Sequence, residues 1–193
     1  MKLYFIAGEA SGDLHGSNLL KELNKQNSSL ELKGFGGDLM QKEGMTISKH
    51  YRDLAFMGFV EVLMNLKTIL KNIAFCKQDI LDFKPDAIVL IDYPGFNLKI
   101  AQFAKENGIK VFYYISPKVW AWKKNRVHKL KANVDELFTI FPFETEWFKQ
   151  YDVEVNYVGN PLLDAINQFE NSNESNLIST EKSIIALLPG SRN

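Results

Sequence analysis

Short unbroken runs of apolar residues recur along the chain, and each is followed by a turn and then by a helical pattern. The clearest run covers residues 87–91 and ends at Asp92, with Pro94 and Gly95 just beyond it. Such a run is typical of a strand buried on both faces in the middle of a parallel sheet. Comparable runs predict further strands at residues 3–7, 30–35, 110–115, 136–141 and 153–158.

Helical spacing fills the intervals between these runs. It predicts helices over 38–43, 54–81, 96–104 and 123–131, and from 161 to about 168. It also predicts one helix that ends near residue 25 and one that starts at 142. The alternation of strand and helix predicts an α/β fold: a Rossmann-like parallel sheet with helices on both faces and right-handed crossovers.

The end of the chain differs in composition from the rest. Residues 170–182 are polar and low in hydrophobic side chains, which is typical of a linker, and residues 183–193 begin another apolar run with a turn after it. We therefore expect a first domain over residues 1–169, a linker over 170–182, and the first strand and turn of a second, truncated domain over 183–193.

Composition and charge narrow the class of protein. The 193 residues are 46% hydrophobic, with 23 basic and 23 acidic side chains, so no global charge favours nucleic acid. The single cysteine, Cys76, cannot form an internal disulfide, and no run reaches the roughly 18 apolar residues of a membrane span. We expect a cytoplasmic protein that can still lie on a membrane.

Asp92 is the first candidate for chemistry. It stands where a central strand gives way to a loop, and ligands of open α/β sheets bind at that edge. The alternative is that its carboxylate only bonds the amides of its own turn.

The first predicted strand is followed by a glycine-rich turn at residues 8–16. The spacing of its glycines fits neither a dinucleotide fingerprint nor a Walker A loop. Backbone can still approach a ligand there, and the start of the next helix can receive an anion. The candidate binding residues are Gly8, Ser11, Gly12 and Asp13, although Ser11 or Asp13 can instead be the N-cap of that helix.

The first half of the 54–81 pattern is apolar nearly all round. Such a helix must be covered by the core, by a second copy in a homodimer, or by lipid. If lipid covers it, the candidate acyl or membrane contacts are Phe56, Met57, Phe59, Val60 and Leu63.

Ser116, Trp120 and Trp122 follow the strand predicted at 110–115. They fit either a platform for a sugar or a base, or ordinary packing with the indole N–H groups satisfied locally. Between Lys118 and Lys131 there are six basic residues and His128 but no acid, which predicts either a solvated face or contact with phosphates and anionic lipid.

Taken together, these motifs resemble the lipid-A-disaccharide synthase family, and the resemblance runs from end to end in the expected order. The matching segments are residues 8–13 (GEASGD), 56–63 (FMGFVEVL), 91–97 (IDYPGFN), 114–122 (YISPKVWAW), 141–144 (FPFE), 157–162 (YVGNPL) and 187–192 (LLPGSR). The resemblance implies an inverting glycosyltransferase of GT-B architecture, of which this chain is the N-terminal, acceptor-binding part. It further implies transfer of 2,3-diacylglucosamine from its UDP derivative to 2,3-diacylglucosamine 1-phosphate, at the inner face of the inner membrane.

By the same resemblance, Asp92 matches the family's proposed base and Glu9 a second important acid; which of them is the base stays open. Arg192 matches an arginine suited to the diphosphate, and Asn97 and Asn160 are further binding candidates. No cofactor and no metal is expected. A non-catalytic lipid-binding module and another GT-B enzyme, such as a UDP-sugar epimerase, stay open as alternatives, as does a homodimer.

Overall fold

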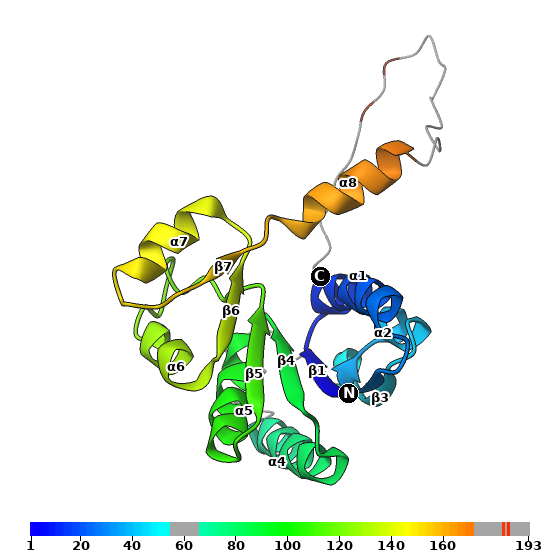
Figure 1. Cartoon of the computed structure of the whole chain (residues 1–193), viewed down its shortest axis with the longest axis vertical. Helices are drawn as coiled ribbons and strands as arrows, with labels where there is room; N and C mark the ends of the chain where they lie inside the picture. Colours follow the sequence, from blue (N-terminus) through cyan, green and yellow to red (C-terminus); the bar gives the residue numbers. More distant parts are fainter. Residues whose placement is uncertain (55–65, 172–182, 184, 186–193) are drawn as a thin grey trace. The chain divides into compact units, whose positions relative to one another are not determined.

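The computed structural model describes residues 1–54 and 66–171, together with Ser183 and Ile185. Strands and helices alternate along this part of the chain (Figure 1). The strands are β1 Lys2–Ala7, β2 Glu31–Gly36, β3 Thr46–His50, β4 Ala87–Ile91, β5 Lys110–Tyr114, β6 Glu136–Thr139 and β7 Asn156–Tyr157. The helices are α1 Ala10–Gln26, α2 Asp38–Lys42, α4 Leu66–Phe83, α5 Pro94–Glu106, α6 Arg126–Asn133, α7 Pro142–Lys149 and α8 Pro161–Asn171, with a 3-10 turn η1 at Tyr51–Asp53.

The described strands form one parallel sheet in the order β3-β2-β1-β4-β5-β6-β7. The chain therefore builds outward from β1 to β3 and then restarts at β4 on the other side of β1. This reversal creates a topological switch point between the carboxyl ends of β1 and β4, where open α/β sheets bind their ligands.

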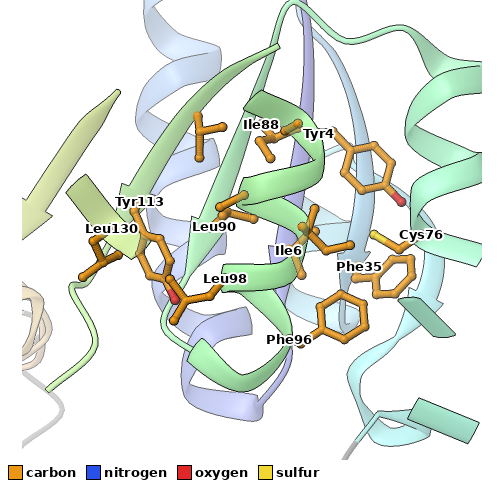
Figure 2. Close-up of a cluster of buried hydrophobic side chains, with 14 of the residues drawn as sticks. Tyr4, Ile6, Phe35, Cys76, Ile88, Leu90, Phe96, Leu98, Tyr113 and Leu130 are labelled. Carbon is orange, nitrogen blue, oxygen red and sulfur yellow. The ribbon is translucent and has the colours of Figure 1, made fainter. Parts of the chain in front are cut away.

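Helices cover both faces of the sheet, as the sequence predicts. Tyr4 and Ile6 of β1 belong to a buried cluster with side chains of α4, α5, α6 and α7, whereas Leu3 and Phe5 belong to a second cluster with α1 and α2. Figure 2 shows the first cluster, in which side chains of β1, β4 and β5 meet those of α4 and α5. Cys76 is fully buried there, and burial raises the pKa of its thiol, so it serves packing rather than chemistry.

Three strand predictions differ from the structure. β3 is not predicted from the sequence, because its residues are at most half-buried and so carry no apolar run. The strand predicted at 136–141 ends at Thr139, and that predicted at 153–158 shrinks to two residues. All three lie in or beside the outer strands of the sheet, where burial is lower and apolar periodicity is weaker.

The chain divides into two compact units, Met1–Asn160 and Pro161–Asn193. The second unit contains α8, so the predicted domain end at residue 169 falls inside that helix. The interpretation of residues 170–182 as a linker and of 183–193 as the start of another domain stays a prediction. None of the helices within the described ranges is long and apolar enough to cross a membrane.

Candidate active site

The register of β1 and β4 brings two acidic residues to one edge of the sheet. Ala7 of β1 is paired with Ile91 of β4, and these are the last residues of their strands. Glu9 follows β1 and Asp92 follows β4, so both lie at the switch point. The two acids, which are more than eighty positions apart in sequence, therefore belong to one site.

Glu9 and Asp92 line a shallow hollow of about 10 Å³, together with Ser11, Gly12, Ile91 and Tyr93. This volume holds about one water molecule, so a larger ligand must rest over the hollow rather than inside it. A larger hollow of about 480 Å³ lies where β6 and β7 begin, lined by Asp135, Glu136 and Asn156 among others. We place the chemistry at the smaller hollow because ligands of parallel sheets bind at the carboxyl ends of the strands.

The backbone at Asp92 adopts an uncommon conformation. Asp92 and Tyr93 both have left-handed φ angles, of 42° and 47°. Non-glycine residues rarely adopt this conformation, and at functional sites the surroundings hold it in place. Here the carbonyl of Asp92 accepts hydrogen bonds from Tyr113 Oη at 2.5 Å and Asn97 Nδ2 at 2.8 Å.

The carboxyl group of Asp92 has an altered acidity. Its side chain is exposed at the surface, yet the packed loops around it remove part of its solvent, and the negative charge of Glu9 adds to that effect. Both raise the pKa of Asp92, against the opposing influences of the Tyr93 amide and Lys118. A carboxylate with a raised pKa is a stronger base once it is ionised.

Glu9 is the N-cap residue of α1, but its side chain makes no capping hydrogen bond. The helix thus begins without using this carboxylate, although the amides at a helix start attract negative charge. The arrangement keeps a second acid beside Asp92, where it can orient a hydroxyl or the other carboxyl group.

Gly8 lies under the ring of Tyr93. A Cβ atom on this glycine would come within 2.3 Å of the ring, so only glycine fits here. The Tyr93 hydroxyl donates to the carbonyl of Leu54 at 3.2 Å. Tyr93 therefore joins the loops after β1 and β4 and anchors the residue that precedes positions 55–65.

Asp13 is buried, and its carboxylate is occupied by backbone groups. It accepts hydrogen bonds from the amides of Gly37, Leu39 and Met40, at 2.8 to 3.1 Å. The expectation that Ser11 or Asp13 caps its own helix is wrong: Glu9 occupies the N-cap of α1, and Asp13 instead accepts from the amides at the start of α2, whose N-cap residue is Gly37. The buried charge is thus accounted for without a ligand, while Ser11 is exposed at the rim of the hollow.

Asn97 is fully buried in the first turns of α5. Its amide nitrogen donates to the carbonyls of Ile91, at 3.3 Å, and Asp92. It supports the loop that carries Asp92 and lies beneath the surface that a substrate would touch.

The segment after β5 separates the two candidate tryptophans. Trp120 Nε1 donates to Glu144 at 3.2 Å, and its ring meets the edge of Phe143, so it is held by local packing. Trp122 is 61% exposed, with Lys123 Nζ at 4.6 Å and the Arg126 guanidinium carbon at 5.7 Å from its ring centroid. The two indoles therefore do not share one environment, as a common sugar platform would require.

Ser116 and Glu144 both serve the backbone near this segment. Ser116 is buried, and its hydroxyl donates to the carbonyl of Pro117 at 3.3 Å. Glu144 is also buried and accepts from the amides of Ile140 and Phe141. In the sequence Glu144 is only an acid in the first turn of a helix, because the fold brings its partner Trp120 Nε1 to it.

The remaining candidates lie at the end of the first unit or outside the described residues. Asn160 is half-buried at the end of the first unit. Arg192 and the proposed acyl contacts Phe56, Met57, Phe59, Val60 and Leu63 lie outside the described residues. In the portions that are described, no group of three or more His, Cys, Asp or Glu side chains could hold a metal ion.

A family model for lipid-A-disaccharide synthetase matches residues 3–193. The chain belongs to this family. The lipid-A-disaccharide synthase of Syntrophus aciditrophicus is 42% identical over 191 residues, which are 97% of this chain and 50% of that protein. The synthase of Geobacter metallireducens is 40% identical over 194 residues, 99% of this chain and 50% of the relative. The chain thus spans about half the length of the curated relatives it matches.

Solved structures identify the fold. The UDP-GlcNAc 2-epimerase of Methanocaldococcus jannaschii, in complex with UDP-GlcNAc and UDP, superimposes with a TM-score of 0.65 at 18% identity, over 92% of this chain and 51% of that one. The Neisseria meningitidis UDP-GlcNAc 2-epimerase gives 0.64 at 14% identity, over 91% and 50% of the two chains. At these identities the likeness concerns the fold alone, which is the N-terminal domain of the GT-B architecture.

Proposed function

We propose that this chain is the acceptor-binding half of a lipid-A-disaccharide synthase. In this proposal 2,3-diacylglucosamine passes from its UDP derivative to 2,3-diacylglucosamine 1-phosphate with inversion, giving lipid A disaccharide 1-phosphate and UDP. The observation that carries the proposal is the juxtaposition of Glu9 and Asp92 at the switch point, in a chain that belongs to this family. The fold likeness to epimerases does not favour an epimerase, because it extends to the fold only.

In the reaction, the Asp92 carboxylate takes the proton of the acceptor hydroxyl as its oxygen attacks the anomeric carbon of the donor. The new carbon–oxygen bond forms as the bond to UDP breaks, and UDP leaves with the electron pair. Glu9 orients the hydroxyl and raises the pKa of its neighbour. We assign stabilisation of the leaving diphosphate to Arg192, since a guanidinium can bind it bidentately.

The acyl chains are assigned to residues 56–63. The support for this assignment lies just before them: Leu54 is buried and accepts the hydrogen bond from Tyr93, next to Asp92. Leu54, the last described residue before the apolar segment, therefore lies at the edge where the base lies. Ser11, Gly12 and the start of α1 are placed to approach the polar head of the acceptor.

We also propose a peripheral contact with the inner face of the inner membrane. The exposed indole of Trp122 carries Lys123 and Arg126 against its ring, and Leu66 and Leu70 at the start of α4 are about half exposed. Cationic groups attract anionic lipid head groups, and tryptophan favours the membrane–water interface.

The test is binding of an acyl-glucosamine 1-phosphate to the 193-residue chain in detergent micelles, measured by isothermal titration calorimetry. We expect saturable binding that survives Asp92→Ala, because the base acts in the chemical step rather than in adhesion. Met57→Glu should abolish binding, whereas Leu81→Glu, which changes an exposed leucine at the far end of α4, should preserve it. No binding by the folded wild-type chain would contradict the proposal.

A further inference from the structure

Tyr113 is a fully buried residue of β5 whose hydroxyl reaches the loop carrying Asp92. In the sheet register Tyr113 is paired with Leu90 of β4, two residues before Asp92. Its side chain crosses from its own strand to the end of the neighbouring strand and donates to the carbonyl of Asp92. Sequence reasoning gave this tyrosine no role, since it lies inside a predicted strand.

The carbonyl of Asp92 receives two side-chain donors, Tyr113 Oη and Asn97 Nδ2, and both residues are fully buried. If the peptide after Asp92 turned to a more common conformation, its carbonyl would move away from both donors, and the shorter hydrogen bond of Asn97 and the hydrogen bond of Tyr113 would be lost in the core. A buried donor that loses its acceptor is not compensated by water. The loss opposes relaxation of the left-handed conformation, so the two hydrogen bonds favour the conformation that the loop has.

We propose that Tyr113 is a positioning residue for the reaction: through the carbonyl of Asp92 it holds the loop conformation that presents the Asp92 carboxylate beside Glu9. Its hydroxyl lies beneath the loop and does not touch the substrate. The inference rests on the proposed function in that it assigns Asp92 as the reacting group. The positioning task is assigned to the Tyr113 hydroxyl. Asn97, from α5, donates to the same carbonyl.

In the alternative, the role of Tyr113 is purely structural, and its hydroxyl needs only a hydrogen-bond acceptor in the core. Tyr4 provides the matched comparison, because it is also fully buried in the same cluster and its hydroxyl donates to Asp79 at 2.7 Å. Figure 2 shows the two tyrosines in separate parts of this cluster, Tyr113 near Leu130 and Tyr4 near Cys76. Phenylalanine preserves the packing at both positions and removes the hydrogen bond that each hydroxyl donates.

Kinetics are measured in a fusion of this chain with the second half of the Geobacter metallireducens relative. We expect Tyr113→Phe to lower kcat about tenfold or more, with KM for the acceptor changed less than about twofold, since a displaced base affects the chemical step and not binding. Tyr4→Phe should leave both constants within about twofold of wild type, although it also loses a buried hydrogen bond. Equal kcat values for the two variants would overturn the inference.

A second measurement uses the 193-residue chain alone and needs no activity. The ¹³Cγ resonance of Asp92 is followed by NMR through a pH titration in the wild type and in both variants. We expect Tyr113→Phe to shift the resonance and lower the titration midpoint, because a loosened loop regains solvent, while Tyr4→Phe changes neither. An unaltered Asp92 titration in Tyr113→Phe would refute the positioning role. A fusion that makes no disaccharide would instead contradict the proposed function, and the NMR result would still decide the inference.

Discussion

Ala7 and Ile91 are paired at the ends of β1 and β4, and this pairing brings Glu9 and Asp92 to one hollow. Neither acid is part of a strand. Each lies just after the end of one, Glu9 after β1 and Asp92 after β4. The sheet therefore fixes the positions of the two loops, while Tyr93, Tyr113 and Asn97 fix the conformation of the second. Within the part of the chain that the structure describes, backbone geometry and hydrogen bonds rather than ion pairs hold the site.

Asp92→Asn should stabilise the folded chain at neutral pH. The folded pKa of Asp92 is raised, so just above the ordinary carboxyl value of about 3.9 the folded chain binds more protons than the unfolded chain. Stability due to this group is therefore present at low pH and is lost as pH rises through the raised pKa. The melting temperature of the variant should exceed that of wild type by a few degrees at neutral pH, and the difference should vanish at about pH 3. Asp53→Asn is the exposed control, and a lower melting temperature for Asp92→Asn at neutral pH would contradict the prediction.

Gly8→Ala should destabilise the protein, because the new methyl group would lie 2.3 Å from the Tyr93 ring. That ring is restrained by its hydrogen bond to Leu54 and by stacking on Phe96. We expect a loss of roughly 1–3 kcal/mol in urea unfolding. The matched control is Gly95→Ala in the first turn of α5, where a Cβ atom meets nothing within 4 Å and alanine favours the helix. Equal stability of the two variants would show that the ring yields without cost.

Asp13→Ala should cost roughly 2 kcal/mol or more, since three amide donors at the start of α2 lose a charged acceptor. Asp38→Ala provides the comparison, because its pairs with His50 and Arg52 lie largely at the surface and exposed pairs contribute little. Chemical denaturation of the two variants measures the difference. If Asp13→Ala were as stable as Asp38→Ala, the capping role would be wrong.

Trp122→Ala should weaken binding to vesicles that contain anionic lipid by roughly three- to tenfold, because it removes an exposed indole and the surface that orders Lys123 and Arg126. Co-sedimentation with phosphatidylglycerol vesicles measures the loss, and pure phosphatidylcholine shows the part that does not depend on charge. Tyr157→Ala changes another exposed aromatic residue and should leave binding unaltered. Identical behaviour of the two variants would remove Trp122 from the membrane contact.

The sequence predicted the central part of the fold better than its margins. Strands such as β1 and β4 are buried on both faces, so their apolar runs are unbroken and their ends are clear. The edge strand β3 has no such run, because its residues are exposed or only partly buried. The apolar pattern of a strand reflects how deeply its residues are buried. The pattern is therefore weaker at the edge of the sheet, where burial is lower.

The candidate site was predicted in part for the same reason. Glu9 and Asp92 follow buried strands, and the edge of a parallel sheet brings such positions together. The tasks of Asp13 and Glu144 could not be predicted, because each depends on backbone amides whose positions are set by the fold. Tyr113 was missed because a hydroxyl inside a strand gives no sign of the carbonyl it will meet.

The central claim is that Asp92 is the base of a glycosyl transfer to a lipid acceptor, and UDP release by the fusion with the Geobacter metallireducens half tests it most directly. With acceptor and UDP-2,3-diacylglucosamine, we expect the wild-type fusion to release UDP in step with disaccharide formation. Asp92→Asn should retain acceptor binding and lose about 10²- to 10⁴-fold in kcat, the range of general base catalysis. An Asp92→Asn fusion that turns over at the wild-type rate would contradict the account.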